Sequence, residues 1–304
     1  MAVLQPGRLR WLSWSLRTLA LALLLGAAGC SAGDGTDGLI AFAAGGSIYT
    51  VRPDGSSLTE VVPGSRESDE TWASAPTLSP LGRSIVFVRD FNLWGVRASG
   101  EDLRLLAEVA DIRPSPGTSD FSLGAQWVAW SPDGRHFAYV TSRINGSGVS
   151  RLWVMDSDDG DHLAVTDFTS DGTAPRWFGS RRILMPLGVL IVVDEPAPPE
   201  ATNEPVALIA SSFVDEGPIT FTADAPDGSS ETVGRGIAAA LSPDGGWFAF
   251  IAGETLFVRS IDGATTREIV DLAALGGSDQ NFASRCGGAA CSYRAPAISW
   301  VALR

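Results

Sequence analysis

The sequence of 304 residues contains no lysine, so arginine supplies all 22 of its basic residues. The absence of lysine excludes a Schiff-base nucleophile, a Ser-Lys catalytic pair and a P-loop lysine. The 35 acidic residues leave a formal net charge of −13 at pH 7. A protein with such a charge repels the phosphates of nucleic acids. We therefore expect no nucleic-acid partner.

The apolar stretch near the N-terminus is too short for a membrane-spanning helix, which needs about 20 residues. This stretch runs from Leu19 to Ala28 without a charge, and Arg8, Arg10 and Arg17 precede it. A positive segment followed by a short apolar stretch is typical of a signal peptide. The sequence therefore predicts export from the cytoplasm.

Residues 26–31 read Gly-Ala-Ala-Gly-Cys-Ser. They resemble the lipobox of bacterial lipoproteins, in which a cysteine after small residues is acylated and becomes the new N-terminus. That family usually has leucine at the position of Ala27. The resemblance implies a signal peptide over residues 1–30, lipidation at Cys30 and a short tether at residues 31–38. Two or three acyl chains hold a protein firmly on a bilayer, whereas one chain binds marginally.

The expected location is therefore the cell envelope membrane, on its extracytoplasmic face or in the periplasm. The sequence does not distinguish the inner from the outer membrane. The alternative is ordinary secretory cleavage near Ala28, which leaves no lipid anchor.

Two cysteines remain after Cys30, namely Cys286 and Cys291. Outside the cytoplasm, such a pair predicts a disulfide, and the small residues between them allow the loop to close. A zinc site is disfavoured because both histidines lie far away in the sequence and two thiolates alone bind zinc poorly. We assign no metal and no cofactor from the sequence.

From Leu39 onward the chain repeats one pattern of short strands and tight turns. Two copies contain Ser-Pro-Asp-Gly, at residues 131–134 and 242–245, and a weaker copy reads Ser-Pro-Leu-Gly at 79–82. Serine and proline suit the first two positions of a type I turn, aspartate accepts backbone hydrogen bonds, and glycine takes a positive φ. Each unit is too small to bury both of its faces alone, so neighbouring units must stack around an axis. The sequence predicts an all-β domain over residues 39–304, a single β-propeller of four-stranded blades.

The two ends of the repeat region complement each other. The first unit begins at Leu39 with a sequence that matches the second strand of the other units, so its own first strand is missing. Residues 295–300 resemble this missing first strand. We expect this C-terminal strand to pair with the first blade and close the ring. Five units are countable, and the long interval between residues 175 and 238 contains a further Asp-Gly turn that fits a sixth unit.

These repeats resemble the WD40-like Pro-Asp repeats of TolB-type exported bacterial propellers, from about Leu39 to Trp300. The resemblance implies a rigid platform for binding proteins or ligands. TolB itself carries an additional N-terminal α/β domain. Only eight residues lie between Cys30 and the first expected strand here, so we expect no such domain between them. Similar repeats precede the catalytic domain of prolyl-oligopeptidase-type peptidases, but this sequence contains no Gly-x-Ser-x-Gly motif.

Two further patterns have alternative interpretations. The acidic segment from Asp156 to Asp161 has carboxylates at spacings that suit calcium, but the same place in other repeats is a hairpin turn, which we favour. His136 and His162 lie beside turns with no nucleophile motif nearby, so we interpret them as surface residues.

The loops that lead into the first strand of each unit are expected near the mouth of the central channel, where acidic, basic and aromatic side chains suit a polar ligand or a basic peptide. The candidate binding residues are Asp69, Glu70, Trp72, Asp120, Asp171, Arg235, Tyr293 and Arg294. The alternative is a hydrated rim without a ligand.

The leading functional prediction is a non-enzymatic, membrane-anchored scaffold that binds an envelope protein, a peptide or a glycan. The alternative is a propeller enzyme, a glycan or peptide hydrolase or lyase that uses carboxylates at the channel mouth. A third interpretation is a spacer whose surface binds nothing.

Overall fold

The computed structural model describes most of the chain beyond residue 36. The described residues are 37–64, 71–109, 123–143, 149–158, 160–169, 175–178, 182–184, 190–192, 207–211, 219–224, 230–236, 238–277 and 298–303. The chain divides into two compact units, residues 1–34 and 35–304, and every described residue belongs to the second. No helix within these ranges is both long and apolar enough to cross a bilayer.

The described strands form six antiparallel sheets. The first sheet contains, in spatial order, β22 (Ile298–Val301), β1 (Leu39–Ala44), β2 (Ser47–Val51) and β3 (Thr59–Val62). The second contains β4 (Ala73–Leu78), β5 (Ser84–Arg89), β6 (Asn92–Arg97) and β7 (Arg104–Ala107). The third contains β8 (Leu123–Trp130), β9 (His136–Arg143), β10 (Val149–Asp156) and β11 (His162–Thr169).

The fourth and fifth sheets have three described strands each. They are β12 (Arg176–Phe178), β13 (Arg182–Leu184) and β14 (Leu190–Val192), then β15 (Ala207–Ser211), β16 (Ile219–Asp224) and β17 (Ser230–Gly236). The sixth contains β18 (Ala238–Leu241), β19 (Trp247–Ala252), β20 (Thr255–Ser260) and β21 (Thr266–Asp271), and the short 3-10 helix η4 (Ala273–Leu275) follows it.

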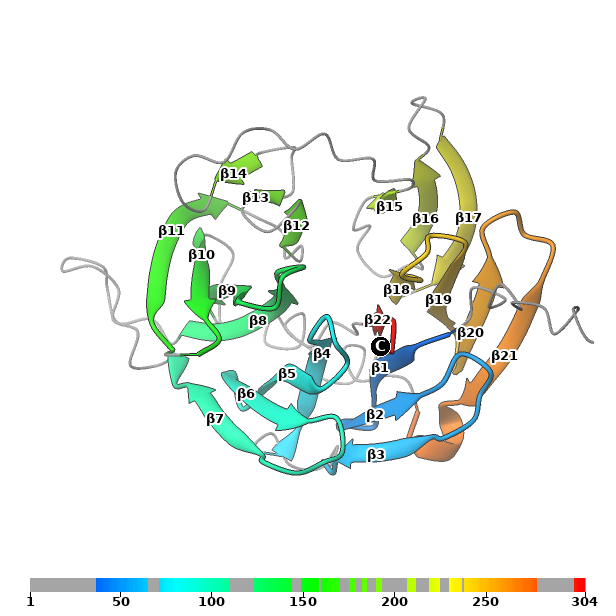
Figure 1. The fold of residues 1–304 in the computed structure, drawn as a ribbon, viewed down its shortest axis with the longest axis horizontal. Coiled ribbons are helices and arrows are strands. Elements are labelled where there is room, and N and C mark those ends of the chain that lie inside the picture. The colour runs from blue at the N-terminus through cyan, green and yellow to red at the C-terminus, as the bar shows by residue number, and fades with distance from the viewer. Residues whose placement is uncertain are drawn as a thin grey trace, which may run out of the picture. The chain divides into compact units, whose positions relative to one another are not determined.

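The sheets are arranged around a common centre, with β22, β4, β8, β12, β15 and β18 nearest to it (Figure 1). Neighbouring innermost strands contact each other from β15 through β18, β22, β4 and β8 to β12. This is the predicted β-propeller. It has six blades in the described part of the chain, and the blade that was hard to recognise in the sequence is β15–β17, within the long interval after residue 175.

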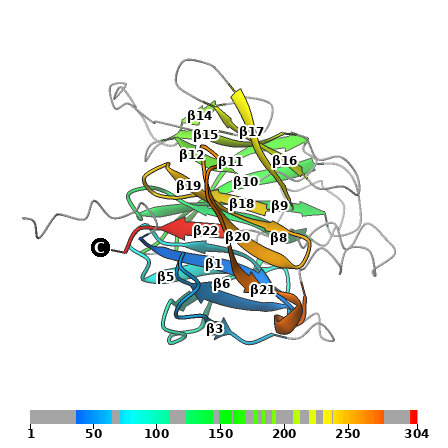
Figure 2. The same ribbon diagram turned by 90° about the vertical axis from the view of Figure 1, so that its right-hand side faces the viewer.

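The C-terminal strand closes the first blade, as predicted. β22 lies antiparallel to β1, with Leu39 opposite Val301 and Ala41 opposite Ser299. The backbone N–H of Leu78 donates a hydrogen bond to Ser299 Oγ at 3.0 Å, so β22 also binds the second blade. Both ends of the described chain therefore meet at one end of the first blade, and Figure 2 shows the C-terminus just beyond the tip of β22.

Alternating residues of one strand pack against different neighbours. In β1, Ile40 and Phe42 belong to an apolar cluster shared with the sixth blade, whereas Ala41 and Ala43 belong to a cluster shared with the second blade. Side chains of a strand alternate between the two faces of its sheet, so a strand that is covered on both faces needs an uninterrupted apolar sequence. This explains the run Leu-Ile-Ala-Phe-Ala-Ala in β1.

The repeated turn has the geometry that its sequence predicts. In residues 131–134, the Ser131 hydroxyl donates to Asp133 Oδ1 at 2.6 Å, and the backbone N–H of Gly134 donates to the Ser131 carbonyl at 2.9 Å. Ser131 Oγ also accepts a hydrogen bond from the backbone N–H of His136 at 3.0 Å. Gly134 has a φ of +71°, which is unfavourable for a residue with a side chain.

The same set of bonds recurs in the sixth blade. The Ser242 and Ser260 hydroxyls each donate to an aspartate two residues later at 2.6 Å. Each hydroxyl oxygen also accepts a hydrogen bond from the backbone N–H of the residue five positions later. In the second blade, Leu81 stands where the other turns have aspartate. The backbone there still forms the turn, since Gly82 N–H donates to the Ser79 carbonyl at 2.8 Å.

Replacing Leu81 by aspartate should stabilise the fold. The new carboxylate would accept hydrogen bonds from the Ser79 hydroxyl and the Arg83 N–H, as Asp133 does in its own turn. A hydrogen bond of this kind contributes about 1 kcal/mol. Urea unfolding should show a higher midpoint for Leu81→Asp than for the wild type, whereas Leu81→Asn, which lacks the charge, should gain less. A lower midpoint for Leu81→Asp would show that the turn in the second blade differs from its relatives.

The turn aspartates should make the fold sensitive to acid. Partial burial raises the pKa of Asp133, but the Ser131 hydroxyl, the Arg135 N–H and the charges of His136 and Arg135 outweigh it, so the net pKa is lowered. The hydrogen bond from the Ser260 hydroxyl is the main cause of a lowered pKa at Asp262. A carboxyl whose pKa is lower in the folded state stabilises the fold above its ordinary pKa of about 3.9, and this stabilisation is lost as the pH falls through the lowered value.

The urea concentration at the unfolding midpoint should therefore be measured at several pH values between neutral and pH 3. It should decrease once the pH is lower than about 4, where an ordinary aspartate takes up a proton. In Asp133→Asn the fall should be shallower, because one of the responsible groups no longer titrates. An identical pH dependence in the wild type and in Asp133→Asn would contradict this explanation.

Candidate functional site

Most residues of the predicted channel rim lie outside the described residues. These are Asp69, Glu70, Asp120, Asp171, Tyr293 and Arg294, and the three cysteines Cys30, Cys286 and Cys291 also lie outside. The structure describes Trp72 and, at the level of the backbone, Arg235. The predicted disulfide and the predicted lipid attachment therefore remain predictions.

Trp72 and Arg235 each lie just before an innermost strand. Trp72 precedes β4, which begins at Ala73, and β17 ends at Gly236, two positions before β18. We call the end of the sheets where the innermost strands begin the rim face. The Trp72 side chain is only 2% exposed, so it packs within the protein beneath the rim.

The rim face is held together by hydrogen bonds between blades. The β1–β2 hairpin turns at Gly45-Gly46, and the Gly46 carbonyl accepts the N–H of Ala73 in the second blade at 2.8 Å. The β5–β6 hairpin turns at Asp90-Phe91, and the Phe91 carbonyl accepts the N–H of Ala125 in the third blade, also at 2.8 Å. The second residue of each turn thus binds the start of the next innermost strand, which connects the first blade to the second and the second to the third at this end.

The Asp90-Phe91 turn is strained. Asp90 has a φ of +49° and Phe91 a φ of +58°, whereas the matching turn of the first blade consists of two glycines. A bulky residue in this left-handed region is rare and costs about 1–2 kcal/mol. Asp90 is exposed and Phe91 is half-buried. Strain of this kind is characteristic of functional positions, where a side chain must be presented at a fixed place.

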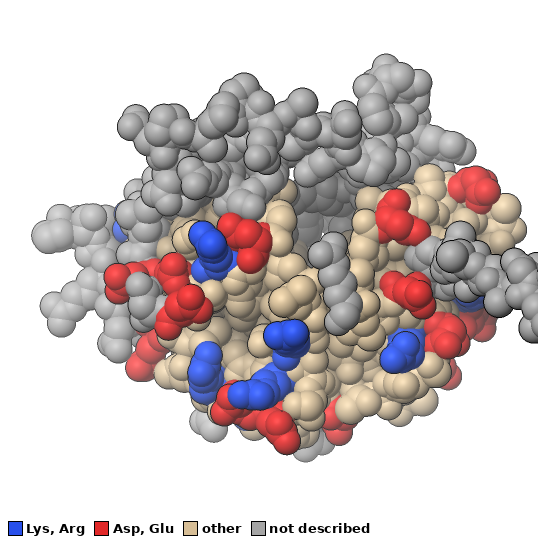
Figure 3. Space-filling model, in the orientation of Figure 1, with Lys and Arg blue, Asp and Glu red and all other residues tan. Residues whose placement is uncertain are grey.

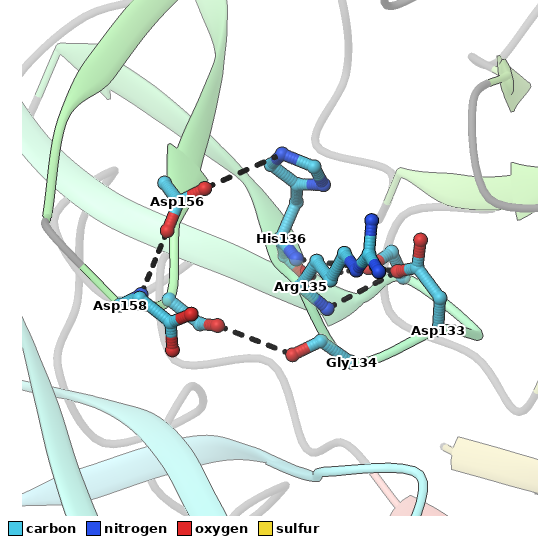
Figure 4. Close-up of polar contacts among 8 residues, drawn as sticks. Asp133, Gly134, Arg135, His136, Asp156 and Asp158 are labelled. Atoms are coloured by element: carbon cyan, nitrogen blue, oxygen red, sulfur yellow. Dashed lines mark hydrogen bonds and ion pairs between the residues drawn. The ribbon is translucent and has the colours of Figure 1, made fainter.

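A second polar cluster lies at the opposite end of the sheets, beside the Ser-Pro-Asp-Gly turn of the third blade (Figure 4). His136 and Asp156 are directly opposite each other on β9 and β10, and His136 Nε2 lies 3.6 Å from Asp156 Oδ2. The imidazole stacks on the Trp177 ring, with centroids 6.5 Å apart. The Trp177 indole N–H in turn donates to the Ala129 carbonyl at 2.8 Å.

This His-Asp pair connects β9 with β10. In the described part of the chain its imidazole has no hydroxyl or thiol partner, which a catalytic pair would activate. Within the described ranges, the buried Nδ1 of His136 has no hydrogen-bond partner, so no hydroxyl or thiol there is placed for activation by it. The two side chains are 27% and 35% exposed, and a pair this accessible contributes at most about 1 kcal/mol. Sequence reasoning treated His136 as a separate surface residue, because the pairing depends on the register of β9 with β10.

The acidic segment after Asp156 forms the hairpin turn between β10 and β11. Asp156 Oδ1 accepts the N–H of Asp158 at 2.7 Å, and the N–H of Asp156 donates to the Asp161 carbonyl at 3.0 Å. The described residues contain no group of three or more His, Cys, Asp or Glu side chains arranged to hold a metal ion.

Comparisons with known proteins identify the fold and no closer relationship. No family model matches the sequence, and neither does any curated protein. The structure has distant similarity to β-propellers. An oligogalacturonate lyase in complex with manganese is 11% identical with a TM-score of 0.41, and the alignment covers 74% of this chain and 70% of that one.

Two further propellers are similar at the same level. A putative TolB from Agrobacterium tumefaciens is 18% identical with a TM-score of 0.36, over 77% of each chain. The C-terminal WD40 domain of Sif2 is 15% identical with a TM-score of 0.36, over 75% of this chain and 68% of that one.

Proposed function

We propose that this chain is an exported lipoprotein whose propeller binds an envelope protein, a peptide or another polar ligand at the rim face. The observation that carries this proposal is the strained Asp90-Phe91 turn, which presents an acidic and an aromatic residue from a turn that is hydrogen-bonded to the next blade. Glycine would form the same turn without strain, so the side chains themselves explain why the strain persists.

The proposal extends to the attachment of the protein. The apolar stretch that ends before Cys30 and the small residues around it support export and acylation. The resemblance of the Pro-Asp repeats to TolB-type propellers supports a role as a binding platform. The acidic residues predicted for the rim, Asp69, Glu70, Asp120 and Asp171, favour a partner that carries positive charge.

A crosslinking experiment in intact cells tests the proposal. The full chain is expressed with an affinity tag, the envelope is crosslinked and solubilised, and the captured proteins are identified by mass spectrometry. The variant Asp90→Gly/Phe91→Gly should lose a partner that the wild type captures in near-stoichiometric amount, while its stability stays equal or rises. Leu81→Asp, at the opposite end of the blades, should keep that partner.

Two results would reject the proposal. Capture of the same partner by the wild type and by Asp90→Gly/Phe91→Gly would remove the turn from the binding site. Equal recovery of the wild type and of Cys30→Ala in the soluble fraction would show that the chain has no lipid anchor.

A further inference from the structure

The opposite end of the sheets, which we call the turn face, carries exposed apolar residues in one place. Leu81 is 47% exposed and Leu303 is 43% exposed. Leu303 lies beside the turn that contains Leu81, because a side-chain carbon at Gly82, the residue after Leu81, would lie 3.0 Å from Leu303 Cδ2. The stretch continues through Pro80 to the turn of the third blade, where Gly134 faces the Pro80 ring and Pro132 is exposed.

Turn chemistry does not explain Leu81. The position is occupied by aspartate in the other turns, where the carboxylate accepts the serine hydroxyl and a backbone N–H. Leucine forfeits these hydrogen bonds and exposes apolar surface to water. A residue that departs from the local rule without a structural gain indicates a contact outside the folded chain.

Basic residues accompany this apolar patch. Arg83 and Arg135 follow the turns of the second and third blades, and both are exposed. Neither forms an ion pair with a described residue. Figure 3 views the turn face and shows its arginines interspersed with acidic residues. The nearby carboxylates of Asp133 and Asp244 accept hydrogen bonds within their own turns.

The first strand of the propeller, β1, also begins at this face. Gly38, just before β1, lies beside the Val301 carbonyl at the end of β22, and Leu303 follows two residues later. Cys30 is eight positions before Gly38, and eight extended residues span at most about 27 Å. An acyl chain on Cys30 therefore holds the start of β1, at the turn face, within about 27 Å of the bilayer.

We propose that the turn face, with Leu81, Leu303, Arg83 and Arg135, lies on the surface of the anchoring bilayer, so that the rim face points away from the membrane. The leucines contact the apolar part of the interface, and the arginines pair with lipid phosphates. This inference rests on the proposed lipid anchor and adds the orientation in which the anchor holds the propeller.

Site-specific photocrosslinking to lipid tests the orientation. The full acylated chain carries p-benzoylphenylalanine at position 81 or 303 on the turn face, or at position 90 on the rim face as a control. It is reconstituted into vesicles of phosphatidylethanolamine and phosphatidylglycerol, irradiated and analysed by intact mass. We expect lipid adducts at positions 81 and 303 and none at position 90. In the Leu81→Asp background, the yield at position 303 should decrease, because the apolar contact beside it is lost.

The outcomes separate the orientation from the anchor. A vesicle-bound chain that forms adducts at position 90, or at no tested position, would overturn the orientation and leave the anchor intact. A chain that does not bind the vesicles at all would overturn both. An unchanged yield at position 303 in Leu81→Asp would remove Leu81 from the contact.

Discussion

Deletion of residues 298–304 should prevent the propeller from folding. The deletion removes β22, which leaves the inner edge of β1 without a partner and exposes Phe42 and Ile40. It also removes Trp300, which is 6% exposed, and the Ser299 hydroxyl that binds the second blade. Loss of a buried tryptophan alone costs about 3–5 kcal/mol, which is comparable to the whole stability of many domains, about 5–15 kcal/mol. We expect an insoluble or unfolded chain by circular dichroism and size-exclusion chromatography.

A shorter deletion provides the control. Removal of Leu303 and Arg304 alone leaves every pair of β22 with β1 in place, so this chain should fold with an unchanged melting temperature. Addition of a synthetic peptide with the sequence of residues 292–304 should restore solubility to the chain that lacks 298–304. A soluble, cooperatively unfolding chain without β22 or added peptide would contradict the role of the C-terminal strand.

Of the glycine-to-alanine substitutions in the described part of the chain, Gly64→Ala should destabilise the rim face most. A side-chain carbon at Gly64 would collide with the Gly46 carbonyl oxygen and would lie 2.7 Å from the Thr71 carbonyl oxygen. Both neighbours are backbone, and Gly46 is fixed by its hydrogen bond with Ala73, so neither can move without breaking the contact between blades. Overpacking against fixed atoms costs about 3 kcal/mol. Urea denaturation should show the loss directly.

Gly246→Ala is the matched control. A side-chain carbon there meets only the Asp244 carboxylate, at 3.6 Å or more, and the residue has no positive φ. Alanine at such a position reduces the entropy of the unfolded chain, so the variant should equal or exceed the wild type by up to about 1 kcal/mol. Equal destabilisation by Gly64→Ala and Gly246→Ala would show that the close approach at the rim face does not exist.

The sequence predicted those features that local chemistry determines. The Ser-x-Asp-Gly turns follow from hydrogen bonds within six consecutive residues, and the structure confirms them at Asp133, Asp244 and Asp262. The closure by the C-terminal strand followed from the complementary ends of the repeat region. The blade β15–β17 was indicated only by a long interval and one further Asp-Gly turn, because no Ser-Pro-Asp-Gly sequence occurs between residues 175 and 238.

The remaining features depend on register and on contacts between blades. His136 and Asp156 are 20 positions apart, and only the pairing of β9 with β10 places them opposite each other. The strain at Asp90-Phe91 depends on the close spacing of β5 and β6, which forces a two-residue turn. Trp72, a predicted rim residue, is buried beneath the rim. The local sequence does not show which side chains a neighbouring blade will bury.

The most direct test of the closed propeller is a disulfide between β1 and β22. Ala41 and Ser299 are directly opposite each other, and opposite residues of antiparallel strands have Cα atoms about 4.5–5.5 Å apart, which suits a disulfide. In a chain whose three native cysteines are replaced by serine, Ala41→Cys/Ser299→Cys should form the bond on mild oxidation, as seen by mass spectrometry of the digested protein. Ala43→Cys/Ser299→Cys, shifted by two residues, should remain reduced. A bond in the shifted pair, or in neither, would contradict the closure of the ring by the C-terminal strand.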